Sequence, residues 1–518
     1  MRRSLSALFL FVLLLIVCFA CDSKSNGHVV TLEELQEWIR PEYSLSADRM
    51  WQVIQTTDLH SEGKMYADHY VHEYYSQRSM PLVWLTREGI SSQADTLLSF
   101  LAETGDMGIA SKTFHTDTLK RLISRIRTYD YKGTNANNVL GQTEFLLTQA
   151  LVRYACGQRY GFIHPRHVFN HLLPDVPASG ETQKTVVYRL IFDQGNEEAT
   201  DSFFHHTLEQ VRSHRLGTFL REIQPDAPLY QKMQKEYVQA KSQGDTTRTR
   251  LARINMERAR WRYPQPTGNR YIWVNLAAQE LTAVDTERDT MTTMRVCCGN
   301  WNHKTPLLHS AIRHVELNPY WVIPQTIVRK EILPSHTGDS AYFARNRYHA
   351  INKETKEEVN PASLSASDLR SARYTLRQER GAGNSLGRII FRFPNNFSVY
   401  LHDTNNHSAF QRTNRAVSHG CVRVERPLDL ALFFLDDPSP LFVDRIRMAI
   451  DRPPLTLEGR KYKETHPDAK PMPSFSYDRP VPVWLDYWTL YPTPKGTLQA
   501  FGDPYDYDKV IEKKLDSL

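Results

Sequence analysis

The chain has 518 residues, of which 41% are hydrophobic and 11% aromatic, and its formal net charge is +6. This composition excludes an intrinsically disordered protein, and the length predicts two or three domains. The sequence has no Lys/Arg-rich run with interleaved aromatic residues, which argues against nucleic-acid binding. The modest positive charge is ordinary for solubility and also suits an acidic polymer.

The N-terminus has the pattern of an export signal over residues 1–20, because two arginines precede the apolar run Leu8–Ala20. The small residue before Cys21 predicts lipoprotein processing, with a lipid on Cys21 that tethers the protein to a membrane in the periplasm or cell envelope. Phe19 is bulky, and Cys18 stands where such signals usually have Leu. Cleavage without lipidation and an uncleaved anchor are therefore the alternatives.

The first half of the chain has helical spacing. Residues 21–60 read as a linker with one short helix, which opens with a capping box at Thr31 and Glu34. Residues 61–250 are expected to form an all-α domain, since apolar residues such as Ala94, Leu97 and Leu101 repeat at helical intervals. A polar, helix-like connector closes this half.

From Arg270 the hydrophobic pattern changes to that of strands, so residues 251–518 are expected to form a mainly-β, sandwich-like domain. A polar insertion at about 335–384 interrupts the strands, and loops of this length are often functional. The fold class is therefore α+β multidomain. The expected strands and the final hairpin are Tyr271–Leu276, Leu281–Val284, Met291–Cys298, His309–Leu317, Arg388–Phe393, Ser398–His402, Val481–Leu490 and Thr497–Phe501.

The segment Tyr400–Val424 carries the residues of a thiol acyl-transfer site. Cys421 is the expected nucleophile, and His402, at the end of a strand-like run, is the expected base. Gly420 leaves the backbone beside the sulfur open to a substrate carbonyl. If Cys421 lies in a strand, His419 and Arg423 share its face, and a permanent cation there suits a substrate carboxylate. The competing interpretation is a small core cysteine in an apolar strand.

Other candidate sites are weaker. His303, His309 and His314 do not fall on one strand face and lack an accompanying HExxH motif, so no metal and no cofactor are expected. His407 competes with His402 for the base role but lies in a polar loop. Asp403 either orients an imidazole or caps a turn. Cys297 and Cys298 are read as packing residues.

The order His402, Ser418, His419, Gly420, Cys421, Val422, Arg423 resembles the signature of the L,D-transpeptidases, which have a YkuD-type catalytic domain. Three further blocks resemble the large periplasmic branch of that family, which has a helical scaffold domain. They are NMERARW at 255–261, the block at 318–334 and the block at 376–395. The resemblance covers most of residues 60 to 510.

This resemblance implies a peptidoglycan L,D-transpeptidase that forms 3-3 cross-links between stem peptides through a cysteine thioester. It implies that backbone N–H groups near Gly420 and Cys421 hold the oxyanion, that His419 helps shape that pocket, and that Arg423 holds a substrate carboxylate. Ser418 is placed with the substrate-binding residues and is expected to support one of the two histidines. The insertion becomes a lid, and the thiol becomes a target for carbapenem-type β-lactams.

Two alternatives stay open. The same cysteine supports hydrolysis, as an L,D-carboxypeptidase or endopeptidase, if water replaces the acceptor amine. A non-catalytic wall-binding lipoprotein is the other. The small peptidoglycan-binding module that many large relatives carry before the NMERARW block is not recognisable here, because residues 230–253 read only as a polar connector.

Overall fold

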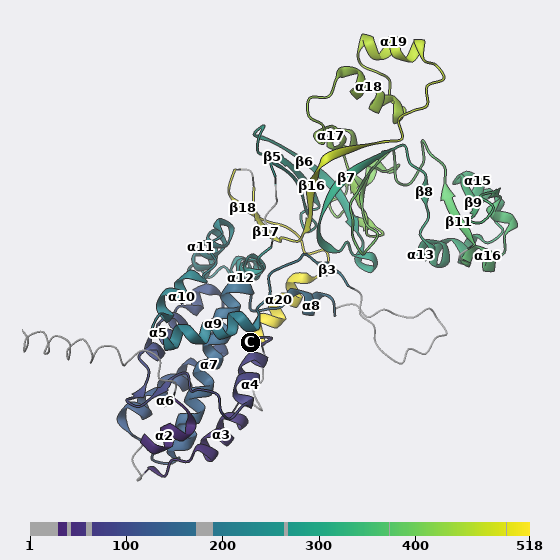
Figure 1. The fold of residues 1–518 in the computed structure, drawn as a ribbon. Coiled ribbons are helices and arrows are strands. Elements are labelled where there is room, and N and C mark those ends of the chain that lie inside the picture. The colour runs from purple at the N-terminus through teal and green to yellow at the C-terminus, as the bar shows by residue number, and fades with distance from the viewer. Residues whose placement is uncertain are drawn as a thin grey trace, which may run out of the picture. The chain divides into compact units, whose positions relative to one another are not determined.

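In the computed structural model, the chain forms two compact units, one helical and one β-rich (Figure 1). The structure describes residues 30–38, 43–57, 65–171, 190–263, 268–371, 373–493 and 495–518. The predicted export signal and Cys21 lie outside these residues. Within the described part of the chain, no helix combines the length and the apolar character needed to span a membrane.

The α+β multidomain class is confirmed, but the predicted boundary at residue 250 is wrong. The helical unit takes residues up to Val168, then Asn196–Tyr263, and finally Tyr507–Leu518. The β-rich unit takes Phe169–Gly195 and Pro264–Asp506. The chain therefore passes between the units more than once, which a reading of local hydrophobic period cannot detect.

The helical unit is built around α7 (Ala136–Tyr160), which is buried along most of its length. Its Glu144 accepts hydrogen bonds from the backbone N–H groups of Trp84 and Leu85 at 3.1 and 3.2 Å, so a buried carboxylate fixes the loop before α5. The predicted capping box at Thr31 is confirmed by reciprocal hydrogen bonds with Glu34. The other helices are α2 (Leu32–Trp38), α3 (Ala47–Thr56), α4 (Asp68–Ser76), α5 (Gln93–Ala102), α6 (Thr116–Thr128), α9 (Asp201–Arg212), α10 (Leu216–Glu222), α11 (Pro228–Ser242), α12 (Thr246–Arg260) and α20 (Tyr507–Asp516), with α8 (Pro165–Phe169) at the unit boundary.

The NMERARW block ends α12 and has a structural role. Glu257 accepts from the N–H of Ile163 at 2.7 Å and pairs with Arg260 at 3.1 Å. Arg258 pairs with Asp508 at 2.7 Å and thereby fastens α20 to α12, both side chains being no more than 3% exposed. The expected polar connector is the α11–α12 helix pair, which belongs to the core of this unit.

The β-rich unit contains one main sheet that closes on itself. Its strands pair in the order β12-β13-β15-β6-β5-β4-β16-β7, and β7 pairs again with β12. The sandwich-like expectation therefore takes the form of a closed ring with a single interior. The strands are β3 (Phe192–Asp193), β4 (Arg270–Asn275), β5 (Glu280–Asp285), β6 (Thr290–Gly299), β7 (Leu307–Leu317), β12 (Ile389–Arg392), β13 (Leu401–His402), β14 (Ala416–Ser418), β15 (Val422–Val424) and β16 (Ser474–Asp486).

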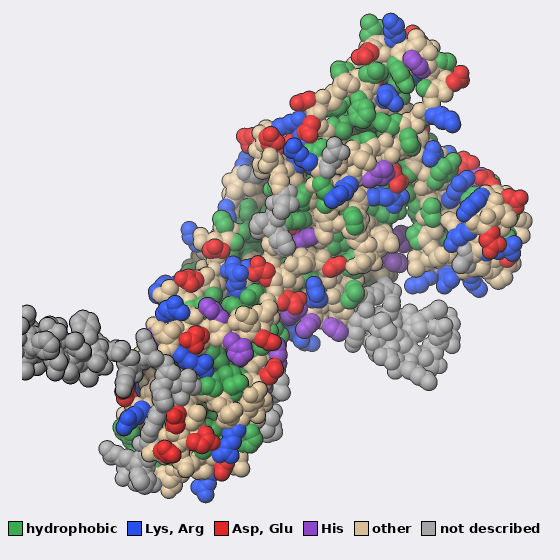
Figure 2. Space-filling model, in the orientation of Figure 1, with side chains coloured by type: hydrophobic (Ala, Val, Ile, Leu, Met, Phe, Trp, Pro, Cys, Tyr) green, Lys and Arg blue, Asp and Glu red, His purple; other side chains and the backbone are tan. Residues whose placement is uncertain are grey.

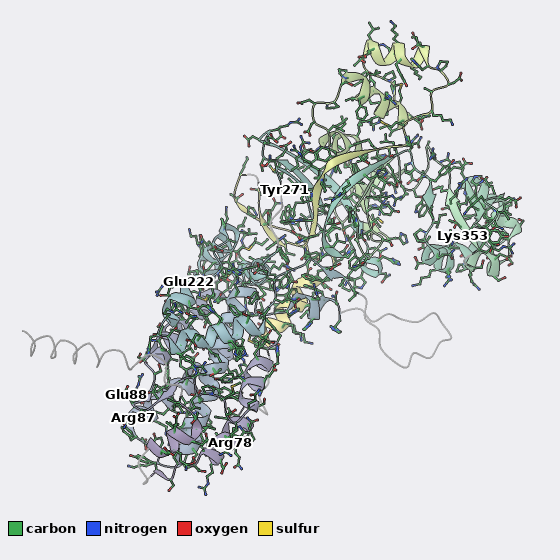
Figure 3. All side chains as sticks on the ribbon, in the orientation of Figure 1. Arg78, Arg87, Glu88, Glu222, Tyr271 and Lys353 are labelled. Carbon is green, nitrogen blue, oxygen red and sulfur yellow. The ribbon has the colours of Figure 1, made fainter. Side chains whose placement is uncertain are left out.

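The strand predictions hold over most of this ring and fail at its end. The β4–β5 hairpin is confirmed, and Tyr271 on β4 is labelled in Figure 3. The predicted last hairpin is wrong for its first arm, because β16 pairs with β7 and β4 in the ring. The hairpin forms later, between β17 (Leu490–Pro492) and β18 (Leu498–Ala500).

Three helices lie between β15 and β16 in the sequence: α17 (Pro427–Phe433), α18 (Pro440–Ala449) and α19 (Leu457–Thr465).

The insertion is a small folded lobe with its own core, which we call the lid; Lys353, directly after β9, marks it in Figure 3. Its boundary at residue 335 is too late, because Ile323 and Val328 already pack in the lid core. Its sheet has the order β10-β9-β11-β8. The elements are β8 (Trp321–Val322), α13 (Gln325–Ile327), a π-helical turn (Val328–Ile332), α14 (Leu333–His336), α15 (Ser340–Arg345), β9 (Tyr348–Asn352), β10 (Glu358–Val359), α16 (Ala366–Arg370) and β11 (Tyr374–Gln378).

We predict that Arg258→Met lowers the free energy of unfolding by about 3–5 kcal/mol, because it leaves the Asp508 carboxylate buried without its cation. The measurement is urea denaturation. Arg250→Met is the matched control: Arg250 also joins α12 to α20, through Glu512, but that pair is about one third exposed, so its loss costs less than about 1 kcal/mol. Equal losses in the two variants would contradict the role given to Arg258.

Candidate active site

Two short parallel strands set the geometry of the site. In the β13–β15 pairing, Leu401 lies opposite Val422 and His402 lies opposite Arg423. Continuing that register by one residue places Tyr400 opposite Cys421, and the N–H of Val422 donates to the Tyr400 carbonyl at 3.1 Å. His402 faces Arg423 across this pair, and Tyr400 contacts both the His402 ring, at 5.7 Å between centroids, and the Cys421 sulfur.

The Cys421 sulfur lies in a polar but enclosed place. Burial raises the pKa of its thiol to about 11, while hydrogen bonds from the backbone and side chain of Tyr400 and the nearby Arg392 and Arg423 act to lower that pKa. The residue keeps some exposed surface. The free protein therefore holds a neutral thiol at neutral pH, with an O–H group and two cations placed to stabilise the thiolate once it forms.

His402 is almost completely shielded, with 4% of its surface exposed. Burial, and then the positive charge of Arg423, lower the pKa of its imidazole to about 3, so the ring is neutral at physiological pH. Its Nδ1 has no hydrogen-bond partner among the described residues. The ring of Tyr400 packs edge-on against it, with the centroids 5.7 Å apart. A neutral imidazole with an uncommitted nitrogen can accept a proton from the thiol.

Two arginines supply positive charge on this face. Arg423 is largely buried, burial lowers the pKa of its guanidinium, and its Nε has no hydrogen-bond partner within the described part of the chain. Arg392 lies over the Tyr400 ring at 5.1 Å and is held by a two-pronged ion pair with Glu316 at 2.5 and 3.1 Å. Arg423 therefore has a buried donor without a partner in this part of the chain, whereas Arg392 is already paired; binding of a substrate carboxylate by Arg423 stays a prediction.

The turn that carries the nucleophile is fixed by its own hydrogen bonds. The Ser418 hydroxyl donates to the Cys421 carbonyl at 2.6 Å and accepts from the Gly420 N–H at 3.2 Å. Gly420 has φ +113°, a conformation that side chains rarely adopt, and a Cβ there would meet only ordinary contacts. The Thr305 hydroxyl donates to the Gly420 carbonyl at 2.8 Å.

These bonds alter two expectations. The Gly420 N–H already donates to the Ser418 hydroxyl. The backbone N–H that is left to hold an oxyanion is therefore that of Cys421 itself. The Ser418 hydroxyl holds the turn and is bonded to neither predicted histidine; its contact with substrate stays a prediction. Glycine is required here by its positive φ, not by a shortage of space.

His419 belongs to a different environment from the other three catalytic candidates. Strand β15 begins only at Val422, so the alternation expected to bring His419 onto the face of Cys421 does not apply. The His419 ring is 5.0 Å from that of His303, and its Nε2 is 2.9 Å from the Glu331 carboxylate of the lid. Both side chains of this ion pair are more than 40% exposed.

The remaining candidates have other partners. The Asp403 carboxylate accepts from the Arg388 N–H at 2.8 Å, so this bond joins two segments of the chain and is not a local turn cap. His407 is exposed and lies 3.8 Å from Asp403. His309 is 3.2 Å from Asp486, and His314 contacts Ser476, so the three histidines once weighed as metal ligands lie in separate surroundings. No cluster of metal-ligating side chains occurs among the described residues.

Sequence reasoning missed Tyr400, Arg392 and Glu331. Tyr400 had a signal, since it stands two residues before His402 and a strand places both on one face. Arg392 and Glu331 had none, because β12 and the lid reach the site only through tertiary pairing.

Two segments of the chain match known protein families. Residues 269–441 match the family model of the L,D-transpeptidase catalytic domain (YkuD), and residues 69–236 match that of a scaffold domain. A Haemophilus influenzae protein named "Putative L,D-transpeptidase" is 29% identical over 306 residues, which cover 59% of this chain and 58% of that protein. An L,D-transpeptidase structure from Mycobacterium smegmatis aligns at 13% identity and a TM-score of 0.18, over 32% of this chain and 53% of the other. A likeness this low carries no weight for the fold.

We predict that the rate of Cys421 alkylation by iodoacetamide rises about tenfold per pH unit from pH 7 to pH 10, because the thiolate fraction grows in that proportion below a pKa of about 11. Intact-protein mass spectrometry measures the rate, with Cys421→Ala as background. A rate that levels off near pH 7 would show instead that the free protein holds a preformed thiolate.

We also predict that Tyr400→Phe slows this alkylation about three- to tenfold at a given pH, because the hydrogen bond that favours the thiolate is removed. Tyr462→Phe is the matched control, since Tyr462 stacks on His466 at α19 and is not part of the site. An unchanged rate in Tyr400→Phe would remove Tyr400 from the account of the sulfur.

Proposed function

We propose that this protein forms 3-3 cross-links between peptidoglycan stem peptides. The premise is that the chain carries the YkuD L,D-transpeptidase catalytic domain together with a scaffold domain. The observation that supports the proposal is the set of contacts at the β13–β15 pairing: Tyr400 and Arg423 lie near the Cys421 sulfur, and the Tyr400 ring packs on His402. The matched relative shares only part of its length with this chain, so substrate and partners are inferred from the site chemistry.

The first half-reaction forms a thioester. The Cys421 sulfur attacks the carbonyl carbon that links the diamino acid at stem position three to D-Ala at position four, and the thiol proton passes to His402. With pKa values of about 11 and about 3, the proton stays on sulfur in the free protein and moves only as the new carbon–sulfur bond forms. The oxyanion is held by the Cys421 N–H and the Tyr400 hydroxyl.

The second step releases D-Ala and prepares the thioester for transfer. His402 returns its proton to the departing amine as the carbon–nitrogen bond breaks, which leaves the ring neutral again, as its burial requires. Arg423 binds a carboxylate of the donor stem peptide through the donor that has no partner in the described structure. A side-chain amine from a neighbouring stem then replaces the sulfur. No step in this sequence calls for a metal or a cofactor.

The location of the protein is part of the proposal. A lipid on Cys21 would hold it at a membrane in the periplasm or cell envelope, where peptidoglycan is the available substrate. Hydrolysis by the same residues gives an L,D-carboxypeptidase or endopeptidase, and differs only in whether water or an amine reaches the thioester. A non-catalytic wall-binding role is disfavoured by the Tyr400 hydroxyl and the two arginines that lie near the sulfur.

We predict that a carbapenem adds its full mass to the wild-type protein and not to Cys421→Ala, because ring opening leaves all atoms of the β-lactam on the sulfur. Intact-protein mass spectrometry is the measurement. Labelling of the variant, or no labelling of either protein, would contradict a reactive Cys421.

Incubation with purified tetrapeptide muropeptides separates transfer from hydrolysis. We predict cross-linked dimers with loss of D-Ala, identified by mass. Tripeptide monomers alone would assign the hydrolytic activity, and unchanged tetrapeptides would leave a non-catalytic role.

A further inference from the structure

Charged side chains of both signs lie around Cys421. The Arg423 guanidinium lies near the Cys421 sulfur and suits an anionic group of the donor, whereas the nearby Arg392 is already paired with Glu316. The negative charge is the Glu331 carboxylate, which lies 2.9 Å from the Nε2 atom of His419. His419 is two residues from Cys421, so their Cα atoms are no more than about 7 Å apart. The acceptor amine arrives as an ammonium ion, and the positive charge of Arg423 repels it.

Glu331 is held rigidly although its side chain is exposed. It lies in the π-helical turn Val328–Ile332, and the residues at both ends of this turn are buried in the lid core, Val328 at 0% and Ile332 at 2% exposure. The neighbouring Arg329 is directed to the Arg370 carbonyl at 3.0 Å. Single π-helical turns often occur at functional sites, because they redirect one side chain without disturbing the helix around it.

His419, unlike His402, can be reached by a second substrate. Its side chain is 41% exposed, whereas His402 is buried. When its Nε2–H is donated to Glu331, the nitrogen that can accept a proton is Nδ1. A carboxylate that orients an imidazole in this way is a common arrangement for a general base.

We propose that Glu331 and His419 form the acceptor side of the site: Glu331 binds the ammonium group of the incoming stem peptide, and His419 removes its proton. This inference rests on the proposed function. The ammonium loses one proton to His419 Nδ1, and the free amine attacks the thioester carbonyl. The carbon–nitrogen bond forms, the carbon–sulfur bond breaks, and the second proton of the amine passes to the departing thiolate. His419 releases its proton to water.

Surface charge on the lid does not by itself single out Glu331. Figure 2 shows cationic and anionic side chains mixed over the lid surface. The distinguishing observation is the direct ion pair between one lid carboxylate and the histidine beside the nucleophile. A matched control is therefore Glu354, an exposed lid carboxylate at the turn after β9.

The test compares wild type, Glu331→Gln and Glu354→Gln with the same tetrapeptide donor and two nucleophiles: a cationic stem-peptide amine, and hydroxylamine, which is neutral near pH 7. We expect Glu331→Gln to lower the ratio of cross-linked dimer to hydroxamate about tenfold or more, because a hydrogen bond to a charged group is lost. Glu354→Gln keeps the wild-type ratio. Raising the stem-peptide concentration restores dimer formation in Glu331→Gln, as expected for a binding residue.

Two results overturn the inference. Equal ratios in the two variants would show that Glu331 does not select the cationic acceptor. If carbapenem acylates Glu331→Gln faster than wild type while the ratio of dimer to hydroxamate is unchanged, the ion pair only holds the lid closed. Carbapenem acylation of wild type also separates this inference from the proposed function, since a protein that is not acylated fails at the earlier step.

Discussion

The site depends on the parallel pairing of two very short strands. β13 and β15 share a register in which Tyr400 faces Cys421 and His402 faces Arg423. Shifting that register by one residue would turn one pair of side chains to the opposite face, and the sulfur would lose both its phenol and its imidazole. The register is held by neighbours on both sides, since β12 pairs with β13 and β6 pairs with β15 in the closed ring.

Burial explains how these four groups divide the chemistry. The same low-dielectric surroundings raise the pKa of the thiol and lower that of the imidazole, so neither is charged in the free protein. Charge appears only when substrate is present, and then beside preplaced donors and cations. This arrangement keeps the thiol protonated, and a protonated thiol is a poor nucleophile toward oxidants. The His419–Glu331 pair, by contrast, is exposed.

The sequence predicts the features that depend on nearby residues, but not those that depend on tertiary contacts. The order of His402, Gly420, Cys421 and Arg423 was readable as a candidate site because their chemistry and spacing are local; their catalytic roles stay predictions. The hairpin β4–β5 and the Thr31 cap were predictable for the same reason. The return of α20 to the helical unit was not, since it depends on Arg258 and Asp508 meeting across the chain. Nor was Glu331 predictable, because a separately folded lid delivers it.

The central claim is that Cys421 carries the donor peptide as a thioester. The most direct measurement is rapid acid quenching during turnover of a tetrapeptide donor, followed by proteolysis and mass spectrometry of the Cys421 peptide. The account predicts a mass increase equal to the donor minus D-Ala, present during turnover, absent in Cys421→Ala and removed by hydroxylamine. Turnover to dimer or tripeptide without any such adduct on Cys421 would contradict it.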